Sequence, residues 1–108
     1  MFYLVKDDVG TQFKAVITRE NDGSLVDLSS ATVRMRLRAK GTTTVLVTLT
    51  STASSEDATN GIAFFTFGSG DLNLTEGKYE GEIEATFTSG NIETVYEIIE
   101  FYLRADFD

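Results

Sequence analysis

The sequence predicts an all-β protein, an immunoglobulin-like antiparallel β-sandwich of about seven strands, with a small β-barrel as the alternative. Three observations predict it. Short runs of alternating polarity recur, turns rich in Gly, Asn, Asp and Ser separate them, and no stretch has the periodicity of a helix. The chain has 108 residues, of which 42% are hydrophobic. That is enough for one core, so we expect a single domain over residues 1–108.

The most regular alternation lies in Gly77–Phe87, which we expect to be the central strand. One of its faces is apolar or small and the other is acidic. The run Thr32–Arg38 has an apolar face and a basic face, so we expect these two strands to pair. The alternative is two separately solvated faces, because exposed ion pairs are individually weak. The expected cross-strand ion pairs involve Arg34, Arg36 and Arg38 on one strand and Glu80, Glu82 and Glu84 on the other.

Before the arginine-bearing run, the sequence predicts two strands and a crossing segment. Phe2–Val5 is apolar on both faces and is expected to be an edge strand. Gly10–Thr18 alternates and is expected to be half buried. Glu20–Gly23 is expected to be a turn, since Asn, Asp and Gly tolerate the positive φ that a hairpin reversal needs. Residues 25–28 are expected to cross the core in a short extended segment.

After the arginine-bearing run, Thr43–Thr50 is rich in β-branched residues, which suit a pleated surface better than a helix. Residues 51–60 are polar and are expected to form a loop. A further strand is predicted at Gly61–Phe67, with Ile62, Phe64 and either Thr66 or Phe67 competing for the inside.

The last third of the chain supplies a connection and a long strand. Leu72 and Leu74 are expected to plug the end of the core, and Ser89–Asn91 is typical of a hairpin turn. The final run, Ile92–Leu103, carries apolar residues in both phases. It changes phase at residues 97–99, as a β-bulge would make it do.

Charge and composition exclude several classes of partner and chemistry. Nine basic against seventeen acidic residues give a net charge of −8, which disfavours binding to phosphate backbones and anionic membranes. The sequence contains no Cys and therefore predicts no disulfide. Residues 1–8 lack the basic leader and long apolar core of a signal peptide, and no stretch is long enough to span a bilayer. We therefore expect a soluble protein made in a cytoplasm.

We expect neither catalysis nor a bound cofactor. The chain has no His and no Cys, so its remaining catalytic options are carboxylate pairs, a Ser-Lys arrangement or a metal. The three glutamates of the central strand are better explained as a solvated or ion-paired row. Asp71 with Asn73, and Asp22 with Asp27, place oxygen ligands in loops, but neither pair matches a calcium-loop spacing. We predict no metal site.

Association is better supported by the sequence than catalysis is. Both chain ends carry more aromatic and aliphatic residues than one strand face can bury. Exposed clusters of this kind on edge strands mark protein interfaces or strand-addition sites. The alternative is a core that wraps both faces of a long strand. The expected interface residues are Phe2, Tyr3, Leu4, Tyr96, Ile98 and Tyr102.

Three stretches, in this order, resemble the N-terminal domain of phage baseplate upper proteins: Asp22–Arg38, Asn60–Phe67 and Leu74–Phe87. The resemblance covers roughly residues 9–103. It implies an immunoglobulin-like sandwich that docks a tail or baseplate component through strand edges and apolar end residues. Its implied partners are other virion proteins, with self-association left open, and its implied location is the virion. The alternatives are a carbohydrate-binding or host-surface-recognition sandwich, and a capsid decoration, neck or tail fibre protein.

Overall fold

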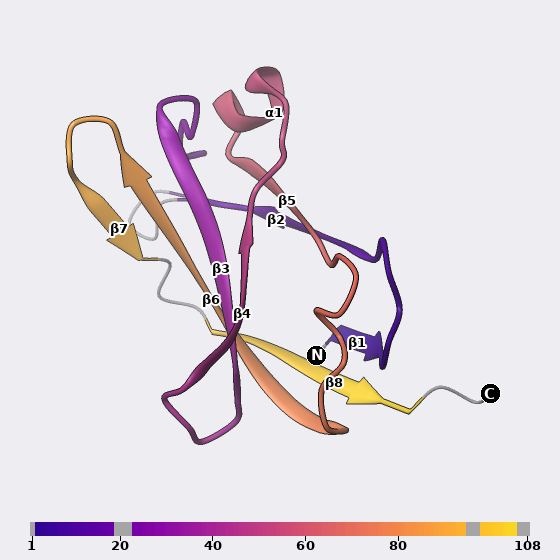
Figure 1. Ribbon diagram of the computed structural model, residues 1–108. Helices are drawn as coiled ribbons and strands as arrows, with labels where there is room; N and C mark the ends of the chain where they lie inside the picture. The colour runs from indigo at the N-terminus through magenta and orange to yellow at the C-terminus, as the bar shows by residue number, and fades with distance from the viewer. Residues whose placement is uncertain (1, 19–22, 95–97, 106–108) are drawn as a thin grey trace.

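The computed structural model describes residues 2–18, 23–94 and 98–105, which form eight β-strands and one short helix (Figure 1). The strands make two sheets, which confirms the predicted all-β sandwich of immunoglobulin-like type. The elements are β1 (Phe2–Val5), β2 (Gln12–Val16), β3 (Ala31–Ala39), β4 (Val45–Thr50), α1 (Ser55–Thr59), β5 (Ile62–Thr66), β6 (Gly77–Phe87), β7 (Ile92–Thr94) and β8 (Ile99–Arg104).

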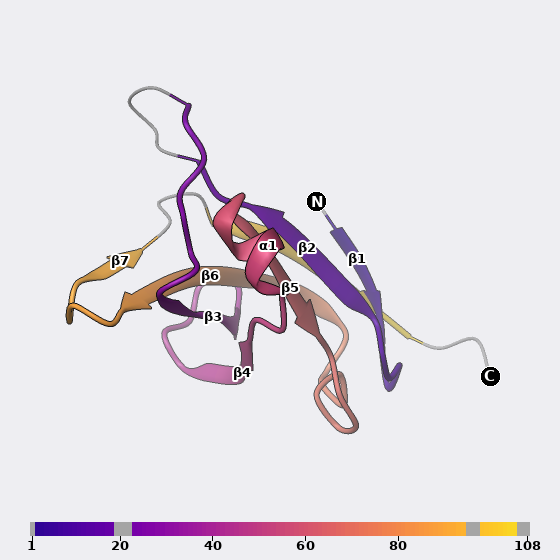
Figure 2. The ribbon, with the colours of Figure 1, turned by 90° about the horizontal axis from the view of Figure 1, so that it is seen from above.

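The larger sheet has the strand order β1-β8-β6-β3-β4, and β7 also pairs with β6. All its pairs are antiparallel except that of β1 with β8, which is parallel. The second sheet contains β2 and β5, which run side by side in a separate layer (Figure 2). Strands β7 and β8 correspond to the two ends of the single strand expected at Ile92–Leu103. The bulge expected at 97–99 falls partly on residues outside those described.

The longest ladder joins β3 to β6 over nine register pairs, from Ala31 opposite Phe87 to Ala39 opposite Tyr79. The expected adjacency of the arginine-bearing and glutamate-bearing strands is therefore correct. Side chains alternate between the two faces of a strand, so one register fixes both faces of the pair. The inward residues of the two strands are Val33, Met35, Leu37, Tyr79, Gly81, Ile83 and Ala85.

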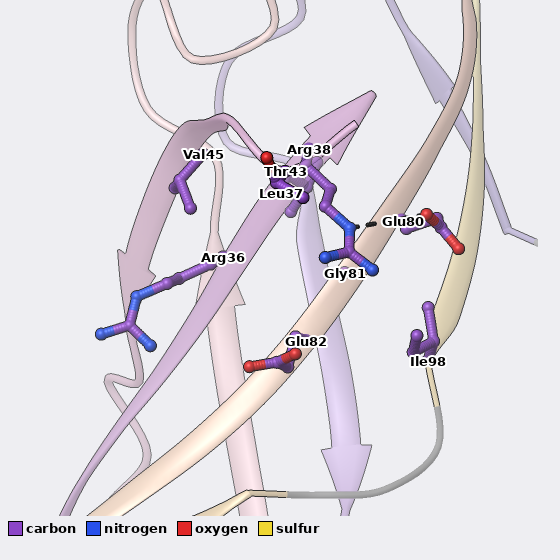
Figure 3. Close-up of a pocket in the computed structure, with 9 residues that line it drawn as sticks. All are labelled: Arg36, Leu37, Arg38, Thr43, Val45, Glu80, Gly81, Glu82 and Ile98. Carbon is purple, nitrogen blue, oxygen red and sulfur yellow. Dashed lines mark ion pairs between the residues drawn. The ribbon is translucent and has the colours of Figure 1, made fainter. Parts of the chain in front are cut away.

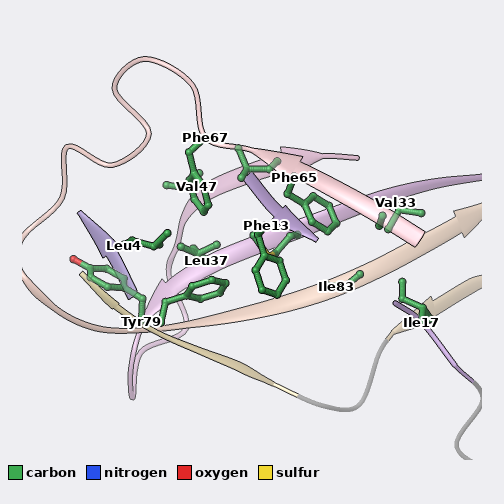
Figure 4. Close-up of a cluster of buried hydrophobic side chains, with 14 of the residues drawn as sticks. Leu4, Phe13, Ile17, Val33, Leu37, Val47, Phe65, Phe67, Tyr79 and Ile83 are labelled. Atoms are coloured by element: carbon green, nitrogen blue, oxygen red, sulfur yellow. The ribbon is translucent and has the colours of Figure 1, made fainter. Parts of the chain in front are cut away.

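Gly81 and three phenylalanines, Phe2, Phe13 and Phe101, join the two layers of the sandwich; Phe13 is among the core side chains drawn in Figure 4. Phe101 of β8 is fully buried, and its ring fills the space where a side chain on Gly81 would lie. A Cβ placed on Gly81 would be 2.9 Å from the Phe101 ring. That ring packs edge to face on Phe13 of β2 at a centroid distance of 5.3 Å, and Phe13 packs on Phe2 at 4.8 Å. Such pairs stabilise a core beyond the area they bury.

Strand β5 has the opposite phase to the one expected. The expectation that Ile62 and Phe64 point inward is wrong, because Ala63, Phe65 and Phe67 are the fully buried residues. Both phases of this run contain a phenylalanine, so alternation alone cannot choose between them. The phase that buries two phenylalanines fills the core between the sheets better than the phase that buries one.

Residues 51–60, expected to be a loop, contain the one-turn helix α1. Its N-cap is Ser54, whose side chain accepts a hydrogen bond from the Asp57 amide at 3.2 Å. Glu56 and Asp57 place negative charge in the first turn, where the helix dipole favours it. The sequence contains this capping signal, but it does not predict a helix here, because no apolar periodicity follows the cap.

The segment before β3 is fixed by a local turn at Asp27. The Asp27 carboxylate accepts a hydrogen bond from the Ser29 amide at 2.9 Å. Hydrogen bonds from the Ser29 side chain and then the Ser29 backbone lower the pKa of Asp27 below its ordinary value. On either side of Asp27, Val26 and Leu28 are buried, so the expected crossing segment does enter the core.

We predict that Gly81→Ala destabilises the domain by about 1–3 kcal/mol, because the added methyl group overpacks the Phe101 ring. Urea unfolding followed by circular dichroism measures the change. Gly68→Ala is the matched control: it also lacks a positive φ, and its Cβ would meet only the Asp71 side chain, at 3.4 Å. Equal losses of unfolding free energy in the two variants would show that the packing of the Phe101 ring does not require a glycine at position 81.

We also predict that Ser29→Ala raises the pKa of Asp27 toward its ordinary value, since the largest cause of the lowering is removed. Carboxyl 13C NMR titration measures the pKa directly. Because the folded-state pKa is lowered, the stability that Asp27 contributes is present at neutral pH and is lost as the pH falls through that pKa. An unchanged titration midpoint in the variant would contradict the assignment to Ser29.

Candidate functional site

The outer face of the larger sheet carries charged side chains at its centre, arginines on β3 and glutamates on β6. In the β3–β6 register, Arg38 lies opposite Glu80, and its Nε is 3.5 Å from Glu80 Oε1. Arg36 bonds diagonally, with Nη1 3.2 Å from Oε2 of Glu84. The side chains of these pairs are 18–33% exposed, so water screens the attraction. They specify the pairing of the strands more than they stabilise it.

Two members of the expected ion-pair set, Arg34 and Glu82, form no ion pair with another described residue. Arg34 is in register with Glu84, but Glu84 bonds to Arg36 instead. Glu82 is in register with Arg36 and lies within 4.0 Å of no cationic group among residues 2–18, 23–94 and 98–105. The diagonal bond of Arg36 therefore leaves one guanidinium and one carboxylate with spare hydrogen-bonding capacity.

A shallow hollow lies over these residues (Figure 3). Its charged lining consists of Arg36, Arg38, Glu80 and Glu82, and Val45 of β4 and Ile98 lie on opposite sides of them. Val45 and Ile98 are 48% and 42% exposed, which is high for aliphatic side chains. The hollow therefore combines charges of both signs with two exposed apolar walls, a composition suited to a polypeptide.

Strand β4 forms the free edge beside this hollow. It is terminal in the sheet order, and its described backbone makes no hydrogen bond beyond the ladder with β3. After Thr50 the chain turns to the second sheet, where the Thr52 amide donates to the Phe64 carbonyl at 2.9 Å. Near its start, the register shifts so that Arg38 pairs with Val45 and Leu37 with Val47, leaving Leu46 as an extra residue. Leu46 is consequently 47% exposed.

The interface residues expected from the sequence do not form one surface. Phe2 and Tyr3 of β1 are exposed at the other end of the larger sheet, and the Tyr3 ring packs edge-on against the half-buried Tyr102, with centroids 6.1 Å apart. Leu4 is buried in the core and offers no surface. Ile98 borders the hollow. Tyr96 lies outside the described residues.

Sequence reasoning did not identify β4 as a functional element, although it placed a strand there. Val45 and Leu46 are its exposed apolar residues. The available signal was the run Val45–Thr50, which contains no charge, no Pro and no Gly. Its significance depends on β4 being terminal in the sheet, and strand order is not encoded in local alternation.

One buried polar group lies on the inner face of the same sheet. Tyr79 packs in the core, and its hydroxyl donates a hydrogen bond to the Thr75 carbonyl. Burial raises the pKa of Tyr79, since removing water disfavours the phenolate. The phenol is thus a structural group that ties the connection before β6 to the core.

Within the described ranges, three or more His, Cys, Asp or Glu side chains nowhere gather in a way that could hold a metal ion. The described helix, α1, is five residues long, and no helix of the described chain has the length and apolar character needed to cross a bilayer.

Fold and surface together define an open β-sandwich with a charged outer face and a free strand edge. No family model and no curated protein matches the chain. Among solved structures, CopC from Methylosinus trichosporium OB3b is similar, with 11% identity, 99% of this chain and 86% of that chain covered, and a TM-score of 0.56. The PmoD soluble domain from Methylocystis sp. ATCC 49242 (Rockwell) has 15% identity, coverage of 94% and 77%, and a TM-score of 0.47. At such low identity the likeness to CopC shows the fold alone.

The resemblance to phage baseplate upper proteins is wrong, because no family model matches the chain and CopC, a protein of another kind, has a similar fold. The assignments that followed from it are corrected too: a virion component, other virion proteins as partners, and location in a virion. The stretches that suggested it are a glycine turn followed by an alternating strand. Many sandwiches contain these features for purely structural reasons.

We predict a coupling free energy of about 0.2–1 kcal/mol between Arg38 and Glu80, because the pair is partly exposed. A double-mutant cycle of Arg38→Gln and Glu80→Gln, measured by urea unfolding, gives this value, and added salt should reduce it. The matched cycle is Arg36→Gln with Glu82→Gln, which are in register but form no ion pair. A larger coupling in the second cycle would contradict the diagonal arrangement.

Proposed function

We propose that this domain is a non-catalytic protein-binding module that adds an extended segment of a partner protein to the free edge of β4. The observation that carries the proposal is that edge: a terminal strand whose outward backbone groups are unpaired among the described residues. Strand addition uses such groups for affinity and the neighbouring side chains for specificity.

The β4 edge lacks most of the devices that normally protect an edge strand. Proteins block edges with Lys, Pro, inward charges or coverage by another element. Val45–Thr50 has none of the first three, and its bulge at Leu46 affects only its start. Exposed Val45 and Leu46 add apolar surface at the same place. An uncharged edge of this kind is favourable for a partner strand and unfavourable for a protein that must remain unpaired.

A binding role also agrees with the chemistry of the side chains. The chain contains no His and no Cys, the commonest general base and the most nucleophilic side chain. The Arg36 and Arg38 guanidiniums in the hollow are held by carboxylates, and their environment is open to water. Such groups recognise a surface more readily than they transfer protons.

Copper handling, the role raised by the structural neighbours, does not fit this chain's donor set. Copper is held by imidazole, thiolate or thioether ligands, and the sequence has neither His nor Cys. Of its two methionines, Met35 is fully buried between the sheets and Met1 lies outside the described residues. The fold is shared with CopC, while the ligands for copper are not supplied by the described residues.

The aromatic end of the sheet is a second candidate surface for the same role. Phe2 and Tyr3 lie on β1, which is the other terminal strand of the larger sheet. Its four residues offer fewer backbone groups than the six of β4. We therefore place the principal site at β4 and keep the aromatic end as its alternative.

We predict that a capped octapeptide alternating valine and glutamine slows amide hydrogen exchange in Val45–Thr50, because added strand hydrogen bonds protect the edge. Exchange monitored by NMR measures this residue by residue. Leu46→Asp should weaken binding of the peptide. Ile92→Asp is the matched control, because Ile92 is also exposed but lies on β7, which pairs with β6 away from β4.

The same peptide with N-methylated valines tests the mechanism, because it cannot donate the strand hydrogen bonds. Protection of Val45–Thr50 by the methylated peptide would contradict strand addition. Protection confined to Phe2–Val5 would move the site to the aromatic end. Absence of any protection would contradict the proposal.

A further inference from the structure

The charges on the outer face form ordered rows that run toward the β4 edge. The registers of β6 with β3 and of β3 with β4 place three residues side by side in each row. In every row the carboxylate is farthest from the edge, the guanidinium is next, and an uncharged residue is at the edge. The rows are Glu84-Arg34-Thr50, Glu82-Arg36-Thr48 and Glu80-Arg38-Val45.

From this order we infer that the segment added to β4 carries carboxylates at alternate positions, which bind Arg34 and Arg36 across the threonines of β4. The inference rests on the proposed strand addition and specifies the chemistry of the partner. A fourth strand in these rows would face guanidiniums rather than carboxylates, so an acidic side chain would continue the alternation of charge.

Two arginines have capacity for another carboxylate. Arg34 has no ion pair within the described residues. Arg36 uses Nη1 for Glu84 and has a side chain that is 33% exposed. A guanidinium carries five N–H donors in a planar fork, so one carboxylate does not saturate it. Both side chains therefore retain donors for a group arriving from the edge.

The distances allow this contact. Neighbouring strands are about 4.8 Å apart, so an added strand would lie about 10 Å from β3. The intervening positions, Thr48 and Thr50, are exposed and short. Long side chains on the two flanking strands can extend over them and meet. A bulky or charged residue at either position would have prevented this.

The net charge of −8 repels an acidic partner at long range, but the arginines of β3 beside the β4 edge determine the interaction at contact. At physiological salt the Debye length is about 8 Å, so distant carboxylates are largely screened. Residues 45–50 contain no acidic side chain, and the charged side chains nearest to them on the outer face are the arginines of β3. The overall charge is expected to slow encounter with the partner more than it weakens the bound state.

The test uses three capped octapeptides in which valine alternates with glutamate, glutamine or lysine, titrated into the full chain by NMR. The glutamate peptide is expected to bind about two- to fivefold more tightly than the glutamine peptide, as for partly exposed ion pairs. Arg34→Gln should remove most of that preference. Lys14→Gln, which removes an exposed charge from β2 in the other sheet, should leave it unchanged.

The outcomes separate the inference from the function on which it rests. Equal binding of the glutamate and glutamine peptides at β4 would overturn the acidic partner and leave strand addition intact. Tighter binding of the lysine peptide would overturn it as well. If none of the three peptides protected β4, strand addition would fail and the inference would fail with it.

Discussion

The antiparallel ladder between β3 and β6 sets the register of the larger sheet and therefore decides which side chains face the core. Its nine pairs place Met35 beside Ile83 on the inner face and Arg36 beside Glu82 on the outer face. A slip by one residue would move the arginines into the core and the aliphatic residues into water. Burying unpaired guanidiniums is far more costly than losing any single exposed ion pair, so the register is strongly specified.

The same ladder determines what remains available for binding. The inner face is filled by the other sheet and by the Phe101 ring over Gly81. The outer face keeps its charges in water, and β4 lies beside the arginines instead of the glutamates. Strand order thus places a row of arginines next to an uncharged edge strand, although the chain as a whole is acidic. The proposed binding function therefore depends on topology more than on any single residue.

Much of this fold could be predicted from the sequence, because alternation in Gly77–Phe87 and Thr32–Arg38 is unambiguous. The predicted orientation of side chains was wrong where both phases of a strand contain large apolar residues. Phe64 and Phe65 occupy both phases of β5, and only packing against the other sheet decides between them. The resemblance to phage proteins was wrong because turn and strand patterns report local geometry, which unrelated sandwiches share.

The candidate site was harder to predict than the fold. The charged rows could be seen in the sequence, but the diagonal bond from Arg36 to Glu84 depends on side-chain geometry that alternation does not encode. The free edge of β4 depends on strand order, since the same residues in a central strand would be unremarkable. Leu4 looked like surface because Phe2–Val5 is apolar on both faces, and its burial follows from the second layer packing over β1.

The parallel pairing of β1 with β8 has a consequence for how the chain reaches this structure. Phe2 lies opposite Phe101, so β1 is synthesised long before its neighbour β8 exists. Until then Phe13 lacks the ring that it packs against in the larger sheet. Contacts so distant in sequence slow folding and lengthen the time during which apolar surface is open to aggregation. The apolar side chains of β1 and β2 that pack on Phe101 therefore stay uncovered until β8 has been synthesised.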